Sequence, residues 1–357
     1  MPVYKNEDKN TWYASFYYTD WQGNRKKKKK EGFPRKKDAQ EFERKFLLQQ
    51  SGSCEMAFGE MTELYLADCK TRQKPTSYYT KENMINNLIL PYFKDMPVKD
   101  ITAVSVRQWQ NTLLSDSKGY SQNYLHTVNG HLSAIFNYAV KFYGLRLNPA
   151  RECGKIKSKA TQINYWKLDQ FNTFMQLIGE TYPVRTMFLL LFWTGIRVGE
   201  LLALTLDDFD FEAHKLHINK SFARLNKTDI IQTPKTEKSN RIISIPPFLE
   251  DEVKTYAAKL YDYEPSERLF NVSKELLTYY IKKACEASDL PKIRIHDLRH
   301  SHASMLINMG FSPLLVQERL GHEKIETTLN IYSHLYQDTQ EELSTRLQEQ
   351  YSTILVR

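Results

Sequence analysis

Near the start of the chain, aromatic and polar side chains alternate, and further on the pattern changes to a helical period. Residues 11–33 alternate, turn at residues 21–24 and continue as a strongly basic segment. A period of two predicts strands, so we expect a β-hairpin or a three-stranded sheet. Residues 38–49 follow with a helical period, which predicts a helix covering that sheet. Its apolar positions are Ala39, Phe42, Phe46 and Leu47.

Residues 58–147 repeat apolar side chains three and four positions apart, as amphipathic helices do. We predict four helices, separated by loops at Pro91, Pro97 and Gly119, and hence a small helical bundle. The helices are predicted from Phe58, over Tyr78–Leu90 and Thr102–Leu114, and from Leu125 to Tyr143.

Beyond residue 164, very apolar helices alternate with short strands. The predicted helices cover residues 167–178, 184–193 and 198–204, and the predicted strands cover residues 209–211, 214–219, 230–233 and 241–245. The polar composition of residues 234–240 predicts a hairpin between the last two strands.

Residues 295–332 predict three more helices and concentrate arginine, histidine and tyrosine. His296 and Arg299 are three residues apart, so they share one helix face. The apolar positions that should turn the opposite way are Leu298, Met305, Leu306 and Met309. The second helix is predicted to begin at Ser312-Pro313 and to end at Gly321, a suitable C′ glycine.

The composition fits a globular protein that binds a polyanion. The chain has 357 residues and a formal net charge of +8. Residues 1–57 hold 13 Lys and Arg against 8 Asp and Glu, a surplus that favours nucleic acid or an anionic membrane as partner. No run of 18 apolar residues occurs, and the N-terminus shows no signal peptide, so we expect a cytoplasmic protein without a membrane partner.

The cysteines and histidines give little support to a metal site. The four cysteines are scattered without a CxxC pair, and we expect free thiols. A histidine cluster is the alternative, since imidazole is a common metal ligand, but Asp297 is the one carboxylate at helical ligand spacing. We therefore expect no metal and no cofactor. The histidines concerned are His296, His300, His302 and His322.

Five segments in order resemble the conserved boxes of the tyrosine recombinases, the phage integrase family. They are TGIRVGELLAL at residues 194–204, TPKT at 233–236, HDLRH at 296–300, LGH at 320–322 and Tyr332. Each box alone is a weak signal, but five in the family's order are specific. The resemblance covers the whole chain, and it is to the integrases of temperate phages and conjugative transposons within this family.

The resemblance implies a catalytic set in which Arg197 and Arg299 clamp the scissile phosphate. Guanidinium is planar, always charged and bidentate toward phosphate oxygens, so the pair suits this task without a metal. Tyr332 is then the nucleophile, which leaves a 3′-phosphotyrosyl link and a free 5′-hydroxyl. A phenol ionises near pH 10, roughly, and therefore needs a positioned base or a positive field.

The other positions in these boxes imply proton transfer and phosphate binding. Lys235 suits the acid that protonates the departing 5′ oxygen, and His322 would donate a hydrogen bond to a phosphate oxygen. Whether His296 acts as the base or only as a phosphate ligand stays open. One ester replaces another of similar energy, so no ATP is needed.

By the same resemblance, the fold is mainly α with small β elements, and its three domains have different tasks. Residues 1–57 match an arm-type DNA-binding domain, residues 58–150 a helical core-binding (SAM-like) domain and residues 165–337 the mixed α/β catalytic domain. We expect a linker at residues 151–164 and a tail helix for protomer contacts at residues 338–357. The candidate arm-site contacts are Arg25, Lys26, Lys27, Lys28, Lys29 and Lys30.

The implied partners are double-stranded DNA with core-type and arm-type sites, and three further copies of the chain in a tetramer on DNA. An excisionase and a host DNA-bending protein complete the expected assembly, at the nucleoid of a bacterial host. Two rival interpretations remain: a type IB topoisomerase-like enzyme, which gives the basic N-terminal sheet no task, and a DNA-binding regulator, which requires a lost catalytic group.

Overall fold

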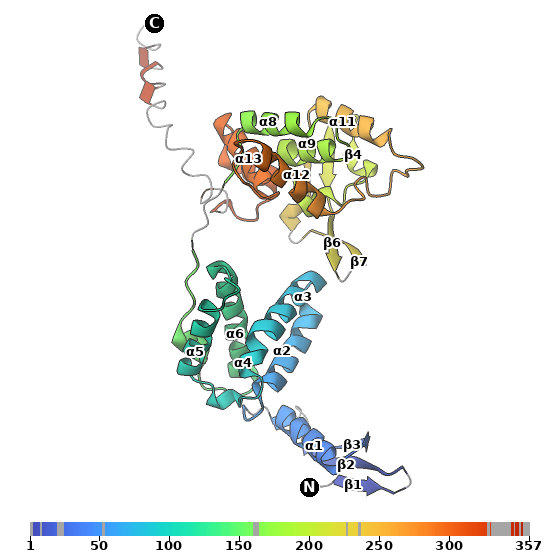
Figure 1. Cartoon of the computed structure of the whole chain (residues 1–357), viewed down its shortest axis with the longest axis vertical. Helices are drawn as coiled ribbons and strands as arrows, with labels where there is room; N and C mark the ends of the chain where they lie inside the picture. The colour runs from blue at the N-terminus through green and yellow to red at the C-terminus, as the bar shows by residue number, and fades with distance from the viewer. Residues whose placement is uncertain are drawn as a thin grey trace. The chain divides into compact units, whose positions relative to one another are not determined.

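The computed structural model divides the chain into two compact units, residues 1–160 and 161–357, which are described separately (Figure 1). The structure describes residues 3–7, 9–19, 25–51, 54–159, 164–225, 228–234, 237–326, 329, 344–345, 347–349 and 351–352. No helix within these residues is long and apolar enough to cross a membrane.

The first unit begins with the predicted three-stranded antiparallel sheet. The strands run in the order β1 (Val3–Asn6), β2 (Thr11–Thr19) and β3 (Arg25–Phe33), and α1 (Lys36–Ser51) packs on one face. Ala14, Phe16 and Ala39 are buried between sheet and helix, so the prediction of a covering helix is confirmed. Leu47 was wrongly assigned to this contact. It lies about 100° around the helix from Phe46 and stays exposed.

A helical bundle completes the first unit, as predicted. Its elements are α2 (Phe58–Arg72), α3 (Pro75–Met84), the π-turn η1 (Ile85–Ile89), α4 (Leu90–Phe93), the 3₁₀ turn η2 (Val98–Asp100), α5 (Ala103–Leu114), α6 (Gln122–Phe142) and α7 (Pro149–Cys153). Phe58, Phe93, Trp109 and Phe136 are fully buried in its core. Thr102 and Ser121 cap α5 and α6 by accepting backbone N–H groups.

Two predictions for this bundle are wrong. Pro91 does not break the chain into a loop, because the π-turn precedes it and removes the helical register in which its ring would clash. Residues 151–159, expected as part of the linker, pack on the bundle instead. Ile156 is buried there, and the Gly154 carbonyl accepts a hydrogen bond from Gln110 Nε2 at 2.8 Å.

The second unit is built around one apolar helix, α9 (Val184–Thr194), which contacts α10, α11, α12 and α13. The remaining helices are α8 (Leu168–Ile178), α10 (Val198–Leu201), α11 (Pro247–Ala257), α12 (Lys274–Ala287), α13 (Asp297–Asn308) and α14 (Pro313–Leu320), with 3₁₀ turns η3 (Leu206–Asp208) and η4 (Glu237–Ser239). The predictions for α8 and α9 are confirmed, whereas α10 ends three residues earlier than expected.

Within its described residues, the second unit has two separate sheets. One has the order β4 (Phe209–Asp210), β5 (Lys215–Ile218) and β8 (Arg241–Ser244). The other is a hairpin of β6 (Ser221–Leu225) and β7 (Thr228–Gln232), which projects from the body of the unit in Figure 1. The hairpin predicted over residues 234–240 is wrong, because β7 pairs with the unpredicted β6 and β8 pairs with β5.

Helix α13 is buried on most sides, contrary to the predicted division into polar and apolar faces. Arg299, His300 and His302 are buried together with Leu298, while Met309 is exposed. The helix packs against both α9 and α14, and Arg299, Ser301 and His302 each form a hydrogen bond inside the protein. The predicted ends of α14 are confirmed, with Ser312 as N-cap and Gly321 in the left-handed conformation at its C-terminus.

Candidate active site

Arg299 lies on α13, and its guanidinium joins two segments that are distant in the sequence. Its Nη1 donates to the carbonyl oxygen of Gly195 at 2.8 Å, and its Nη2 donates to that of Leu320 at 2.5 Å. Gly195 lies two residues before Arg197, and Leu320 lies two residues before His322. Both carbonyls are at C-terminal ends of helices, whose partial negative charge stabilises a buried cation. Three predicted boxes therefore meet at this arginine.

The close approach at Gly195 depends on the absence of a side chain. Its φ is +68°, and a Cβ there would lie 2.6 Å from His302 Cδ2 and 2.8 Å from a methyl carbon of Leu320. Glycine alone tolerates both the left-handed backbone and this contact. The sharp end of α9 thus brings the segment of Arg197 against α13 and α14.

Arg197 is the N-cap residue of α10 and is held by Glu200. Glu200 accepts the Arg197 backbone N–H at 2.9 Å and its Nη1 at 2.7 Å. The same carboxylate accepts two hydrogen bonds from Arg241 of β8, at 3.3 and 3.0 Å. Burial alone would raise the pKa of Glu200, but the charges of Arg241 and then Arg197 outweigh it and lower that pKa. Glu200 is therefore an anion that orients two arginines.

The predicted histidines are neutral in this setting. Burial lowers the pKa of His322 to about 3, assisted by the charges of Arg299 and Arg197. The pKa of His296 is lowered by burial and by the same two arginines. Because these Coulombic effects need proximity, Arg197, His296, Arg299 and His322 lie around one centre. A neutral imidazole can donate one hydrogen bond and accept another, as both proposed tasks require.

Two predicted site residues fall outside the described residues. Lys235 lies between Pro234 and η4, and Tyr332 lies after Leu329, so the structure does not place either side chain. Among the residues it does describe, no three His, Cys, Asp or Glu side chains are grouped as ligands of a metal ion would be.

Three further side chains support this centre: Arg241 and Arg319, which were not predicted from the sequence, and His302, which was predicted only as a possible metal ligand. Arg319 Nε donates to His302 Nε2 at 3.0 Å, and its two terminal nitrogens donate to the Ser244 and Trp193 carbonyls. A signal for Arg241 was present. It occupies the inward register of a strand whose next inward position is Ile243, and a charge at such a position indicates a buried partner.

The basic strand β3 has two different faces. Lys26, Lys28 and Lys30 are opposite Tyr18, Phe16 and Ala14, on the side that α1 covers. Arg25, Lys27 and Lys29 are opposite Thr19, Tyr17 and Ser15, on the open side of the sheet. The Arg25 guanidinium lies 4.5 Å from the centre of the Tyr17 ring, and Lys29 Nζ lies 4.9 Å from that of Tyr13. The open face is thus both cationic and aromatic.

Comparison with known proteins agrees with this organisation. Residues 165–339 match the phage integrase family, residues 57–114 its N-terminal SAM-like domain, and residues 2–50 an arm DNA-binding domain. The ICEBs1 integrase of Bacillus subtilis strain 168 is 30% identical over 314 residues, which cover 82% of this chain and 83% of that protein. The chain belongs to the phage integrase family.

Other relatives extend the same family relationship. The integrase of Staphylococcus phage L54a is 26% identical and covers 80% of this chain and 86% of that protein. The Tn1549 transposon integrase, solved with a circular intermediate DNA, has a TM-score of 0.70 at 20% identity and covers 82% of this chain and 99% of that one. A lambda integrase tetramer bound to a Holliday junction has a TM-score of 0.57 at 17% identity, and the match covers 90% of this chain and 96% of that one.

The predicted fold and enzyme class are therefore confirmed. The protein is a tyrosine recombinase, a site-specific DNA integrase with a mainly helical fold and small antiparallel sheets.

Proposed function

We propose that this integrase cuts and rejoins DNA through a covalent bond between Tyr332 and a 3′ phosphate, and so integrates and excises a mobile element. One observation carries the proposal: the Arg299 guanidinium binds the carbonyls of Gly195 and Leu320, which gathers Arg197 and His322 around it. A cluster of fixed cations beside neutral imidazoles is suited to stabilise a phosphodiester whose negative charge shifts during displacement.

In the proposed reaction, the Tyr332 phenolic oxygen attacks phosphorus as the bond from phosphorus to the 5′ oxygen breaks. The phenolic proton goes to His296 or, if His296 only binds phosphate, to solvent. Lys235 donates a proton to the 5′ oxygen, so charge and atoms balance without an oxidant or ATP. Arg197, Arg299 and His322 bind the non-bridging oxygens. Religation is the same exchange in reverse, with a 5′-hydroxyl as the nucleophile.

For DNA binding, we propose that the open face of β3 contacts arm-type sites while the helical and catalytic domains bind the core-type site. The match of residues 2–50 to an arm DNA-binding domain supports this division. Two linked modules raise the overall affinity through effective concentration, by roughly 10²–10⁴. The proposed domain limits are those given by the sequence, with the linker shortened to residues 160–164. An excisionase and a host DNA-bending protein remain proposed partners at the bacterial nucleoid.

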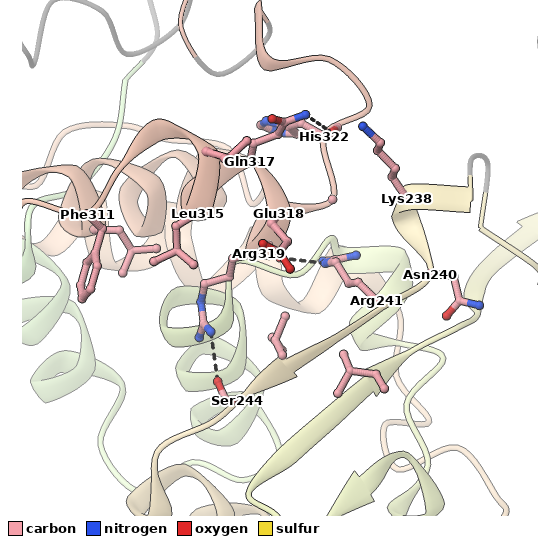
Figure 2. A pocket seen from close by; sticks show the side chains of 15 residues that line it. Lys238, Asn240, Arg241, Ser244, Phe311, Leu315, Gln317, Glu318, Arg319 and His322 are labelled. Atoms are coloured by element: carbon pink, nitrogen blue, oxygen red, sulfur yellow. Dashed lines mark hydrogen bonds between the residues drawn. The ribbon is translucent and has the colours of Figure 1, made fainter.

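We further propose a tetramer in which the tail of one protomer docks on its neighbour. The support is a groove of about 810 Å³ between β8 and α14, whose apolar lining includes Phe311, Leu314 and Leu315 (Figure 2). In the tail, Leu347 and Tyr351 are four residues apart and 61% and 58% exposed. A helix carrying both on one face is suited to fill such a groove.

Trapping on a nicked core-site substrate tests the chemistry directly. A nick just beyond the scissile phosphate releases a short fragment and prevents religation, so cleavage accumulates as protein-linked DNA. We expect Tyr332→Phe to abolish this product and to retain DNA affinity, because only the phenolic oxygen is lost. Tyr336→Phe is the matched control and should still form the adduct. A protein-linked band with the Tyr332→Phe protein would exclude Tyr332 as the nucleophile.

The trapping assay excludes a binding regulator, and a plasmid-relaxation assay with a strand-exchange assay separates a topoisomerase-like enzyme from a recombinase. A type IB topoisomerase-like enzyme would relax supercoiled plasmid as a monomer without exchanging strands between two attachment sites. A binding regulator would form no adduct at all.

A further inference from the structure

Arg241 lies at the start of β8, and its guanidinium binds three separate segments around the active site. It is 8% exposed. Its Nη1 and Nη2 donate to the two carboxylate oxygens of Glu200, its Nη1 also donates to the Ser239 carbonyl at 3.1 Å, and its Nε donates to the Arg319 carbonyl at 2.8 Å. Figure 2 shows the last of these bonds, from Arg241 to Arg319.

The bonds from Arg241 to Glu200 affect Arg197, one of the two arginines proposed to bind the scissile phosphate. Glu200 accepts hydrogen bonds from the backbone and from the guanidinium of Arg197. The position of that carboxylate therefore determines the orientation of the Arg197 guanidinium. Arg241 binds both oxygens of the same carboxylate, and at 3% exposure Glu200 has little access to water that could replace Arg241. Loss of this bond would leave Glu200 free to rotate with Arg197.

The second bond acts on η4, the turn that follows Lys235 in the sequence. Ser239 belongs to η4, which begins directly after Thr236, and its carbonyl is fixed by Arg241. Lys238 of the same turn donates from Nζ to the Glu323 carbonyl at 3.2 Å, next to His322. The turn η4 is therefore tied to β8 and to the chain just beyond α14.

The third bond acts on the end of α14. The Arg319 carbonyl accepts from Arg241, and that of its neighbour Leu320 accepts from Arg299. Gly321 follows, and a Cβ there would lie 2.8 Å from the Lys238 carbonyl and 3.0 Å from Arg241 Cδ. The Arg241 side chain is thus packed against the turn that delivers His322, and only glycine leaves room for it.

We propose that Arg241 is a positioning residue for strand cleavage, one that fixes the relative places of Arg197, of η4, which follows Lys235 in the sequence, and of the turn that carries His322. It touches none of the reacting atoms in this assignment, which rests on the proposed function of those three groups. A displacement of order 1 Å at such groups costs about 10²-fold in rate, so three small displacements at once should be visible in catalysis before they are visible in folding.

The test uses the full-length chain and Arg241→Lys, which keeps the charge but removes the fork that reaches three segments at once. Cleavage of the nicked core-site substrate is measured under single turnover at saturating protein, together with DNA affinity and the thermal unfolding midpoint. We expect cleavage to fall about 10- to 100-fold, with affinity changed less than about threefold. Arg185→Lys is the matched control, since Arg185 forms a half-buried ion pair with Glu252 at the other end of α9.

Two altered substrates distinguish positioning from a general loss of structure. In a 5′-bridging phosphorothiolate substrate, the leaving group is a 5′ thiolate, which needs no acid to protonate it. A methylphosphonate substrate lacks the negative charge that Arg197 and Arg299 are proposed to neutralise. On one or both of these substrates, the cleavage rate of Arg241→Lys relative to wild type should be at least tenfold higher than on the unmodified substrate. A merely structural defect would lower all three rates by the same factor and would overturn the proposal, as would wild-type cleavage by Arg241→Lys.

A second variant covers a failure to fold. If Arg241→Lys unfolds below the assay temperature, Arg241→Gln replaces it, because a neutral amide leaves Glu200 paired with Arg197. The same expected and contrary outcomes apply to it. Failure of the proposed function is a separate result, since wild-type protein would then form no covalent adduct with the unmodified substrate.

Discussion

At the scale of single residues, the site is notable for buried histidines that stay neutral. Burial lowers the pKa of His302 to about 3 and that of His300 to about 4, against an ordinary value of 6.5. The unfolded chain therefore binds more protons than the folded one below pH 6.5. Stability should be highest above that pH and should fall as the pH is lowered, by up to about 1.4 kcal/mol per pH unit for each such histidine.

Thermal unfolding measured from pH 7 down to about pH 5, where most carboxylates are still ionised, checks this prediction. His302→Gln keeps an acceptor for Arg319 and removes the titration, so its unfolding midpoint should depend less steeply on pH than that of the wild type. Identical slopes for wild type and His302→Gln would contradict the prediction.

At the scale of elements, the alternation of side chains along strand β3 determines which of its six consecutive cationic residues can enter a DNA groove. Side chains alternate across a strand, so the open face carries half of them and the α1 side the other half. If the open face reads the arm site, replacing Arg25, Lys27 and Lys29 by Gln should abolish protection of discrete DNA repeats. Replacing Lys26, Lys28 and Lys30 by Gln removes the same charge and should mainly weaken binding at all sequences.

Footprinting and the salt dependence of affinity separate the two triple variants. For every phosphate that a variant no longer neutralises, the slope of log affinity against log salt should become shallower by about 0.9. The second triple variant should still protect the repeats at higher protein concentration. Equal loss of protection in both would mean that the strand acts as a sequence-independent electrostatic anchor.

At the scale of the whole molecule, assembly should depend on the tail and on the groove that we propose receives it. Truncation after Gln337 should weaken synapsis of two sites by at least tenfold while single-site binding changes little, because the tail is proposed to contact a second protomer. Leu314→Asp should have the same effect, since its exposed side chain lines the groove. Gel-shift titration measures single-site binding. Native mass spectrometry of the protein–DNA complex shows whether four protomers are bound.

Leu177→Asp, on an exposed position of α8 outside the groove, is the control for the added charge. A truncated protein that loses single-site binding and synapsis equally would point to a tail that folds back on its own protomer.

The sequence by itself determined the features that depend on near neighbours. The period of two in β2, the caps at Thr102 and Ser312 and the left-handed end at Gly321 require only a few residues of context. The order of the five boxes was also visible, and it identified the family and four side chains that the structure gathers around one centre. Lys235 and Tyr332 stay predictions of that order alone.

Only the tertiary structure decided what surrounds those side chains. The bond from Arg299 to Gly195 spans 104 positions, and that from Arg241 to Glu200 spans 41, so no local pattern encodes either. For the same reason the sequence misplaced the polar face of α13 and paired β7 with β8. Buried charge is stable only where distant segments supply its partners, and those partners become visible when the chain is folded.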